Sequence, residues 1–409
     1  MKKVGFFLFL LTLAGGMIST ADTGETENKE EKKAVLTERT YQRLVAIHRL
    51  IEEEKTSEAI QHLDALLPEV EGDSYAAAVV HQTYGYAYVG IEAYPKAIDS
   101  FEAALALDAL PGTPARRILY DLAQLYTATE DYAQGIAAIE RWLIEAPDPP
   151  PGAHVLAASG YIQLKRFPNA ISHLRRAIAL SPTPKEGWYQ SLLALYYELS
   201  EYREAARLLE TIISHFPEKP IYWNQLSSLY MTLKEDEKAL AILELAYMKG
   251  LLQEKEIVLL ANLYLYQEVP YKAGIVLEQG LKEGIIASTK ENWKRLSDAW
   301  GRAKEPNRAV AALQEAAELS REGDLDIKRG ALLVELGRWE EAIEALETGI
   351  LKGGIKDEGQ GYLLLGIARN EGGDRRGAIA SFKSAIGSPG TNRSAAQWLT
   401  YLQGEKAPE

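Results

Sequence analysis

The sequence predicts an all-α fold, a right-handed α-α superhelix (a solenoid) of about ten helical hairpins that ends in a C-terminal capping helix. Three observations lead to this fold class. A phrase of the form Ala-x-x-x-large-x-x-small returns every 33 to 38 residues, an aromatic residue often stands nine residues before it, and proline or glycine often follows it. Self-similarity at such a period is the signature of stacked helical repeats, in which each unit buries its apolar face against its neighbours.

The first 21 of the 409 residues differ in character from the rest of the chain. Two lysines precede a largely apolar run from Val4 to Ile18, and small residues follow at 19–21. This order is typical of a cleaved secretory signal peptide. The alternative is an uncleaved anchor, but about 15 apolar residues interrupted by paired glycines fall short of the roughly 20 that span a bilayer. We therefore expect an exported protein with no stable membrane span after cleavage.

Residues 22–38 are expected to form an acidic, disordered leader. The segment from Asp22 to Lys33 is rich in Asp, Glu and Lys and has no large apolar side chain. Such a composition cannot bury enough apolar surface to fold.

The repeat array is expected to span residues 39–390. Its ten anchoring residues are Ala59, Ala97, Gly135, Ala170, Ala205, Ala239, Ala273, Ala309, Ala342 and Ala378. A core residue stands four positions after each anchor, about one helical turn further on: Leu63, Phe101, Ile139, Leu174, Leu209, Leu243, Leu277, Leu313, Leu346 and Phe382. Each pair shares one helix face, which we interpret as the second helix of a hairpin.

The residue types at these positions fit a close crossing of two helices. A small anchor lets the two backbones approach, and a larger side chain there would cost about 1–3 kcal/mol. The aromatic residues belong to the preceding helix and fill the space beside the crossing: Tyr88, Tyr126, Tyr161, Tyr196, Tyr230, Tyr264 and Trp300.

Proline or glycine is expected to end the second helices, because proline cannot continue a helix and glycine accepts the positive φ of a helix C-terminus. The residues in these places are Pro147, Pro182, Pro217, Gly250, Gly284 and Gly353.

Two further segments bound the array. The proline-rich run at 146–152 is a candidate elbow, either a hinge or a rigid polyproline-type linker. After residue 390, the segment Arg393 to Gln403 places Trp398, Leu399 and Leu402 on one helix face. Residues 391–409 are therefore expected to form a capping helix and tail that shield the last repeat.

Several units resemble the tetratricopeptide repeat. The stretches that carry the resemblance are Trp223-x-x-Leu226-Ser227-x-x-Tyr230 with Ala239-x-x-x-Leu243-x-x-Ala246, and Gly85-x-x-Tyr88 with Ala97-x-x-x-Phe101-x-x-Ala104. The resemblance implies stacked hairpins whose first helices line a concave groove.

Longer phrases resemble the periplasmic tetratricopeptide proteins found beside the TonB, ExbB and ExbD energy-transducing system of Gram-negative bacteria. These phrases are Ala194 to Leu199, Ala246 to Leu252, Leu260 to Gly284 and Trp398-Leu399-x-x-Leu402. The likeness covers nearly the whole chain after the signal, less specifically from Thr40 to Ala146. It implies a periplasmic accessory that helps this proton-motive-force complex energise outer-membrane receptors, typically for iron-chelate uptake, with TonB, ExbB or ExbD as a partner.

Charge and cysteine content narrow the function classes. Lys and Arg total 45 against 58 Asp and Glu, a formal charge of -13, so nucleic acid is not an expected partner. Cys is absent, which excludes disulfides, thiolate metal sites and cysteine nucleophiles. The six histidines fall on different helices of the repeat register without metal-ligand spacing: His48, His62, His81, His154, His173 and His215.

Motifs for catalysis or cofactor binding do not stand out. Gly359-x-Gly361 and Gly366 lack the spacing and the preceding strand of a dinucleotide fingerprint, and Gly366 fits the small slot of a first helix. The sequence has no nucleophile elbow or phosphate-binding loop. We therefore expect no enzyme, no cofactor and no metal site.

What remains is binding, and the repeat register proposes a surface for it. First-helix residues one place after the Trp slot and one place after the Gly slot are expected to face the concave groove: Gln82, Tyr86, Tyr120, Gln124, Ser159, Gln190, Asn224, Ser228, Asn262, Lys294 and Asp298. Amides and Tyr hydroxyls predominate, and a ladder of them can hydrogen-bond the backbone of an extended peptide. The alternative is that these residues are polar only because the groove is wet.

Two function classes stay open. The first is a periplasmic scaffold that grips an envelope partner, TonB or its ExbB–ExbD motor, through the groove. The second is a scaffold or regulatory subunit of envelope polysaccharide or peptidoglycan assembly that binds glycan. In that case Tyr86, Tyr120 and Tyr197 would stack on sugar rings.

Overall fold

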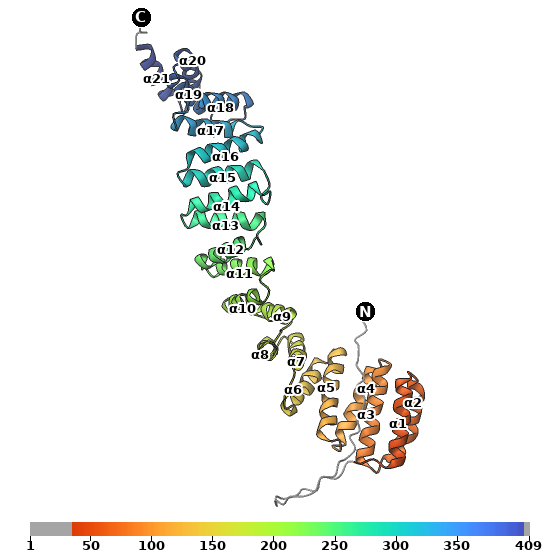
Figure 1. Ribbon diagram of the computed structural model, residues 1–409. Coiled ribbons are helices and arrows are strands. Elements are labelled where there is room, and N and C mark those ends of the chain that lie inside the picture. Colours follow the sequence, from red (N-terminus) through yellow and green to blue (C-terminus); the bar gives the residue numbers. More distant parts are fainter. Residues whose placement is uncertain (1–34, 405–409) are drawn as a thin grey trace, which may run out of the picture. The chain divides into compact units, whose positions relative to one another are not determined.

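The computed structural model describes residues 35–404, so the expected signal peptide and most of the expected leader lie outside the described residues. The described residues form 21 α-helices and no strand (Figure 1). The all-α fold class is therefore confirmed. The first helix, α1, begins at Glu38, where the Thr37 hydroxyl accepts a hydrogen bond from the Thr40 amide at 3.2 Å.

The chain divides into two compact units, residues 1–166 and 167–409. The helices of the first unit are α1 (Glu38–Glu52), α2 (Thr56–Val70), α3 (Ser74–Gly90), α4 (Tyr94–Ala106), α5 (Gly112–Ala128), α6 (Tyr132–Glu145) and α7 (Pro151–Gln163). Helices α1 to α6 pack as three consecutive hairpins, and α7 packs against α6 across the 146–152 run. Whether that run bends stays a prediction.

The second unit continues the same pattern. Its helices are α8 (Phe167–Leu180), α9 (Glu186–Glu198), α10 (Tyr202–His215), α11 (Pro220–Thr232), α12 (Asp236–Met248), α13 (Glu254–Tyr266), α14 (Pro270–Lys282), α15 (Lys290–Arg302), α16 (Pro306–Glu318), α17 (Asp324–Glu335), α18 (Trp339–Lys352), α19 (Glu358–Glu371), α20 (Arg375–Ile386) and α21 (Asn392–Gly404). Helices α9 to α20 pack as six hairpins, and α21 packs on α20.

The ten anchors lie on the even-numbered helices α2 to α20, and all of them are buried. The core residues four positions later are buried as well, from Leu63 at 0% exposure to Leu313 at 4%. The predicted series of about ten units is therefore confirmed. The fourth repeat contributes α7 to the first unit and α8 to the second.

Tight turns join the two helices of each repeat, and each turn has one residue with positive φ, five positions before the anchor. These residues are Glu54, Glu92, Glu130, Lys165, Ser200, Lys234, Glu268, Lys304, Gly337 and Gly373. The next amide donates back to the last turn of the first helix, as Glu235 does to the Tyr230 carbonyl at 2.8 Å. Such a left-handed residue closes a helix C-terminus.

The second helices end where the sequence predicts. Helices α6, α8 and α10 end two residues before a proline, at Glu145, Leu180 and His215. The three glycines Gly250, Gly284 and Gly353 have φ values of 70°, 74° and 69°. Each of these segments can therefore turn sharply into the next repeat.

Tyrosines of the first helices connect consecutive repeats. Their hydroxyls donate to a carboxylate on the second helix of the preceding repeat, and each acid directly follows the core residue four positions after an anchor. The pairs are Tyr84–Asp64, Tyr126–Glu102, Tyr161–Glu140, Tyr230–Glu210 and Tyr264–Glu244. Burial, together with the accepting carboxylate, raises the pKa of Tyr161 to about 12. We call these five pairs the tyrosine–acid ladder.

Candidate partner-binding site

The eleven residues predicted for the groove lie on first helices, as the repeat register requires. Five lie in the first unit: Gln82 and Tyr86 on α3, Tyr120 and Gln124 on α5, and Ser159 on α7. Six lie in the second unit, on α9, α11, α13 and α15: Gln190, Asn224, Ser228, Asn262, Lys294 and Asp298. These two sets are named here the first-unit surface and the second-unit surface.

A buried acid organises the first-unit surface. Asp121, on α5, is 2% exposed. The Tyr86 hydroxyl donates to its Oδ2 at 3.2 Å, and the Arg117 Nε donates to Oδ1 and Oδ2 at 3.2 and 3.1 Å. The ring of Tyr86 meets Phe101 edge-on, with centroids 5.1 Å apart. Tyr86 therefore links α3 to α5, and its hydroxyl proton is already used.

The electrostatics of this cluster follow from burial. Burial raises the pKa of Asp121 and outweighs the opposing effects of Arg117 and Tyr86. Burial also raises the pKa of Tyr86 to about 12, and the charge of Asp121 adds to the shift. Burial lowers the pKa of Arg117, but the charge of Asp121 and its hydrogen bond more than compensate, and the pKa ends above its ordinary value. Arg117 therefore carries its charge throughout the physiological range.

The other members of the first-unit surface differ in how far they face solvent. Tyr120 is half-buried, with its ring centroid 5.0 Å from that of Trp142. Gln82 and Gln124 are also half-buried. Ser159 donates to the Leu156 carbonyl of its own helix at 2.7 Å. This serine is therefore turned toward its own backbone.

Glu186 joins the first two helices of the second-unit surface. The Lys219 ammonium donates to Glu186 Oε2 at 2.5 Å, and the Tyr222 hydroxyl donates to Oε1. The Gln190 amide donates to the Tyr222 hydroxyl at 3.0 Å. Hydrogen bonds from Lys219 and then from Tyr222 hold the pKa of Glu186 below its ordinary value. The predicted residue Gln190 thus belongs to a bridge between α9 and α11.

Two more bridges join the next first helices. The Asn224 amide of α11 donates to Glu256 Oε1 of α13 at 3.2 Å, while Asn224 Oδ1 is buried without a hydrogen-bond partner. The Asn292 amide of α15 donates to Glu254 Oε1 of α13 at 2.7 Å. These bonds fix the side chains before any partner arrives.

Ser228 and Asn262 are the exposed, unbonded part of the second-unit surface. Both side chains are exposed and form no hydrogen bond with another residue in the described part of the chain. Tyr266, one helical turn after Asn262 on α13, is 71% exposed. Lys294 and Asp298 are separate from these, since they pair with each other at 3.7 Å along α15.

Sequence reasoning missed the residues that hold the predicted ones: Arg117, Asp121, Glu186, Lys219, Tyr222, Glu254, Glu256 and Asn292. The sequence does contain a feature that points to several of these residues, namely the spacing between bonded partners. The bonded pairs Tyr86–Asp121, Glu186–Tyr222, Asn224–Glu256 and Glu254–Asn292 are separated by 35, 36, 32 and 38 residues, about one repeat. A search for polar pairs at the repeat period would have found them.

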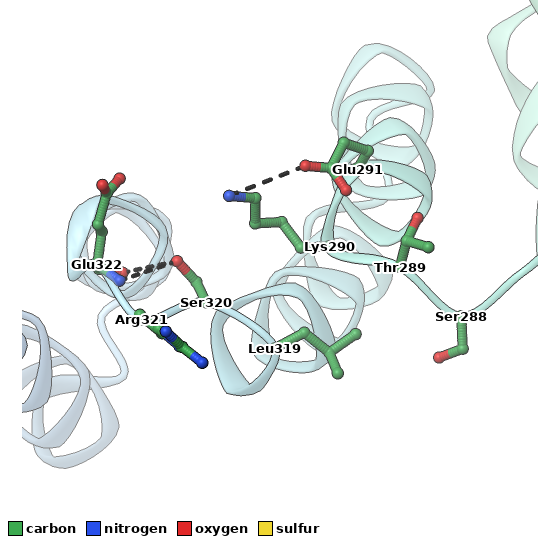
Figure 2. Close-up of a pocket in the computed structure, with 8 residues that line it drawn as sticks. All are labelled: Ser288, Thr289, Lys290, Glu291, Leu319, Ser320, Arg321 and Glu322. Carbon is green, nitrogen blue, oxygen red and sulfur yellow. Dashed lines mark hydrogen bonds and ion pairs between the residues drawn. The ribbon is translucent and has the colours of Figure 1, made fainter.

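An open depression lies between the start of α15 and the connection from α16 to α17 (Figure 2). It is lined by Ser288, Thr289, Lys290, Glu291, Leu319, Ser320, Arg321 and Glu322. Lys290 pairs with Glu291 at 3.8 Å, and the Ser320 hydroxyl donates to the Glu322 carbonyl at 2.9 Å. Among the charged side chains of this depression, Lys290 and Glu291 pair with each other, and Arg321 and Glu322 are exposed to solvent.

The side chains and helices of residues 35–404 bear on metal binding and membrane crossing. No group of three or more His, Asp or Glu side chains in this range is placed to hold a metal ion. None of the helices in the same range combines the length and the apolar composition that a bilayer crossing requires.

Comparisons with known proteins agree with the repeat pattern. The tetratricopeptide repeat family model matches residues 85–150, 193–250 and 327–397. No curated protein matches the chain.

Solved structures show partial similarity. One, a tetratricopeptide repeat protein from Parabacteroides merdae ATCC 43184, is 18% identical over 64% of this chain and 99% of that one, with a TM-score of 0.36. YrrB, described as a tetratricopeptide repeat protein with an unusual peptide-binding site, is 19% identical over 47% of this chain and 98% of its own, with a TM-score of 0.36. The family match and the repeated helix pairs agree. The chain is a helical-repeat protein, and three stretches of it match the tetratricopeptide repeat family model.

Proposed function

We propose that this protein is a scaffold that binds an extended segment of a partner protein along the first helices of its repeats. One observation carries the proposal. Inter-repeat hydrogen bonds hold the bridging side chains Gln190 and Asn224 in place, while Ser228 of α11 and Asn262 of α13 remain exposed and unbonded. The bonded side chains are already ordered, which reduces the ordering that binding requires, and the unbonded side chains keep their donors and acceptors for a partner.

The chemistry of the exposed groups suits a peptide. A Ser hydroxyl and an Asn amide each donate and accept, so they can satisfy the N–H and C=O groups of an extended chain. The exposed ring of Tyr266 offers apolar contact to a side chain beside Asn262.

The partner we propose is TonB or the ExbB–ExbD motor, with this protein as a periplasmic accessory of outer-membrane iron-chelate transport. The support comes from the sequence: a signal-like N-terminal segment and the long phrases, such as Leu260 to Gly284, that resemble the periplasmic proteins of that system.

Recovery of partners from an envelope extract tests both parts of the proposal. We expect the full chain to recover TonB, ExbB or ExbD, and a variant with Ser228→Ala and Asn262→Ala to recover about tenfold less, since each lost hydrogen bond contributes about 0.5–1.5 kcal/mol. The matched control is Asn169→Ala with Ser172→Ala on α8. It removes the same groups from exposed positions of a second helix.

Equal recovery by the two double variants would contradict the binding surface. Recovery of other envelope proteins alone would keep the scaffold and exclude the TonB system.

The glycan alternative fits the geometry less well. The rings of Tyr86 and Tyr120 are packed against Phe101 and Trp142, which covers part of the aromatic surface that a sugar would use. A thermal shift with peptidoglycan fragments but none with peptide pools would favour glycan binding, because a ligand that binds only the folded state raises its midpoint.

A further inference from the structure

We infer that the first-unit surface selects a partner segment that carries an acidic side chain, and that Arg117 binds this carboxylate through its two terminal nitrogens. The inference rests on the proposed function and adds the chemistry of the bound segment. It concerns the first unit alone.

The guanidinium of Arg117 is only half used within the protein. Its Nε donates to both carboxylate oxygens of Asp121, and the side chain is 51% exposed. In the described part of the chain, Asp121 is the single acid that pairs with it. The Nη1 and Nη2 groups therefore keep their donors for a group outside the protein.

Asp121 gives the guanidinium one orientation. The carboxylate is 2% exposed, so it cannot itself receive a partner, and the Tyr86 hydroxyl holds it from the other side. A guanidinium fixed at Nε presents Nη1 and Nη2 as a planar fork, which matches the two oxygens of a carboxylate. The orientation is set before binding, which reduces the entropy lost on binding.

The groups around Arg117 favour an acid within a chain. Gln82 lies one turn before Tyr86 on α3, and Gln124 lies two turns after Arg117 on α5, so both helices of this cluster carry a half-buried amide. Amides suit the backbone of a chain that continues in both directions. The acid that binds Arg117 is accordingly an Asp or Glu side chain of an extended segment.

A peptide array measures this preference directly. The probes are random decapeptides, acetylated and amidated at their ends, each printed once with Glu and once with Gln at a central position. Because the termini are blocked, the side chain supplies the carboxylate that distinguishes the members of a pair. The full chain is applied, and the peptides that bind are then measured by fluorescence anisotropy.

We expect peptides that bind the wild-type chain to include a set in which the Glu member binds about tenfold more tightly than the Gln member, as for a charge-assisted bidentate contact on a half-exposed arginine. In Arg117→Gln this difference disappears. Arg117→Lys retains a charge beside Asp121 but loses the fork, and we expect it to keep a preference of no more than about threefold.

The matched control is Arg116→Gln. It removes the same charge one residue earlier on α5, and Arg116 instead donates to the Thr113 hydroxyl within its own helix. We expect the control to keep the wild-type preference. Circular dichroism of each variant checks that the helices remain.

The outcomes separate the two levels of the proposal. Peptides that bind wild type without any Glu preference would overturn the acidic-segment inference and leave the scaffold function standing. An equal loss in Arg116→Gln and Arg117→Gln would also overturn it, because net charge alone would then explain the preference. If no peptide of either kind binds, the peptide-binding function itself fails and the inference fails with it.

Discussion

Gly366 shows how a single residue sets the distance between two helices. A Cβ added to Gly366 of α19 would lie 2.5 Å from Cε1 of Phe382 on α20. Phe382 cannot move aside, because it is fully buried and its ring stacks on that of Trp398, with the ring centroids 5.5 Å apart. The sequence predicts this small slot, and the structure confirms it.

Replacing Gly366 by Ala is therefore expected to destabilise the second unit by about 1–3 kcal/mol, as overpacking does in a dense core. Gly301→Ala is the matched control, since a Cβ at this exposed position of α15 meets nothing within 4 Å. We expect it to stabilise by about 0.5–1 kcal/mol through helix propensity. Urea midpoints of both variants followed by circular dichroism test this, and shifts of the same sign would contradict the close crossing.

Glu186 makes stability depend on pH. Hydrogen bonds from Lys219 and Tyr222 lower the pKa of Glu186 in the folded protein below its ordinary 4.5. The folded state therefore releases this proton more easily than the unfolded chain. Its stabilising effect is present above pH 4.5 and is lost as the pH falls through the lowered pKa.

Thermal melts of wild type and Glu186→Gln at pH 7 and pH 3 measure this effect. We expect the variant to melt lower at pH 7 and to lose less on acidification, because Gln cannot be protonated in this range. Glu198→Gln, an exposed substitution on the same helix, should keep the wild-type pH dependence. If the difference in melting temperature between wild type and Glu186→Gln were the same at pH 7 and pH 3, the stabilising role of the carboxylate would be contradicted.

The contrast between Gly366 and Asp121 shows what sequence reasoning reaches at this scale. The small slot of Gly366 follows from periodicity, because steric fit repeats in every unit. The Tyr86–Asp121 pair has the repeat spacing, but the role of Asp121 also depends on its burial and on Arg117 of the same helix, which the anchor pattern does not report. The repeat register places Gln190 and Asn224 on the correct helices, but it does not predict their hydrogen bonds with Tyr222 and Glu256.

Among the structural elements, the turn between the two helices of a repeat is the one whose left-handed residue could not be predicted from the sequence. Only Gly337 and Gly373 among the ten left-handed turn residues are glycines, and the rest are charged residues or serine. Proline and glycine mark the ends of several second helices in the sequence. The non-glycine turns gave no comparable signal, although their position five residues before the anchor is constant.

Lys234→Gly tests the strain of these turns. Lys234 has a φ of 60°. We expect the free energy of unfolding to rise by about 0.5–1 kcal/mol. Glycine removes the left-handed penalty of about 1–2 kcal/mol, which exceeds its entropic cost of about 0.5–1 kcal/mol.

Ala241→Gly, at an exposed interior position of the adjacent helix α12, provides the control and should lose about 1 kcal/mol. Denaturant midpoints compare the two. A loss in Lys234→Gly as large as that in the control would refute the expected strain.

For the whole molecule, the period predicts how many units the chain has but not where it divides. The register passes unbroken from Gly135 through Ala170 to Ala205, yet the division into two compact units falls after Arg166. A repeat pattern reports the packing that every unit shares, whereas a boundary depends on how well two particular units pack. The residue types at the anchors do not indicate which two neighbouring units pack less well.

Limited trypsin digestion checks the division. Lys165 and Arg166 are exposed in the short connection that follows α7, and chains are cut most readily where few contacts cross. Within residues 35–404 we expect the first cut after one of these residues, leaving two helical fragments. Lys234 occupies the same register position within the second unit and should be cut later. Earlier cleavage at Lys234 would contradict the two-unit division.

The tyrosine–acid ladder bears on how such a chain changes length during evolution. Each rung takes its donor from one repeat and its acceptor from the repeat before. Four of the five donors stand nine residues before their anchor, and Tyr84 stands 13 residues before Ala97. A duplication of one whole period inside the ladder therefore inserts a new donor and a new acceptor together, and both neighbours still find their partners. A duplication of any other length leaves a buried hydroxyl unmatched. Growth of the array by complete units is accordingly the route that preserves every rung.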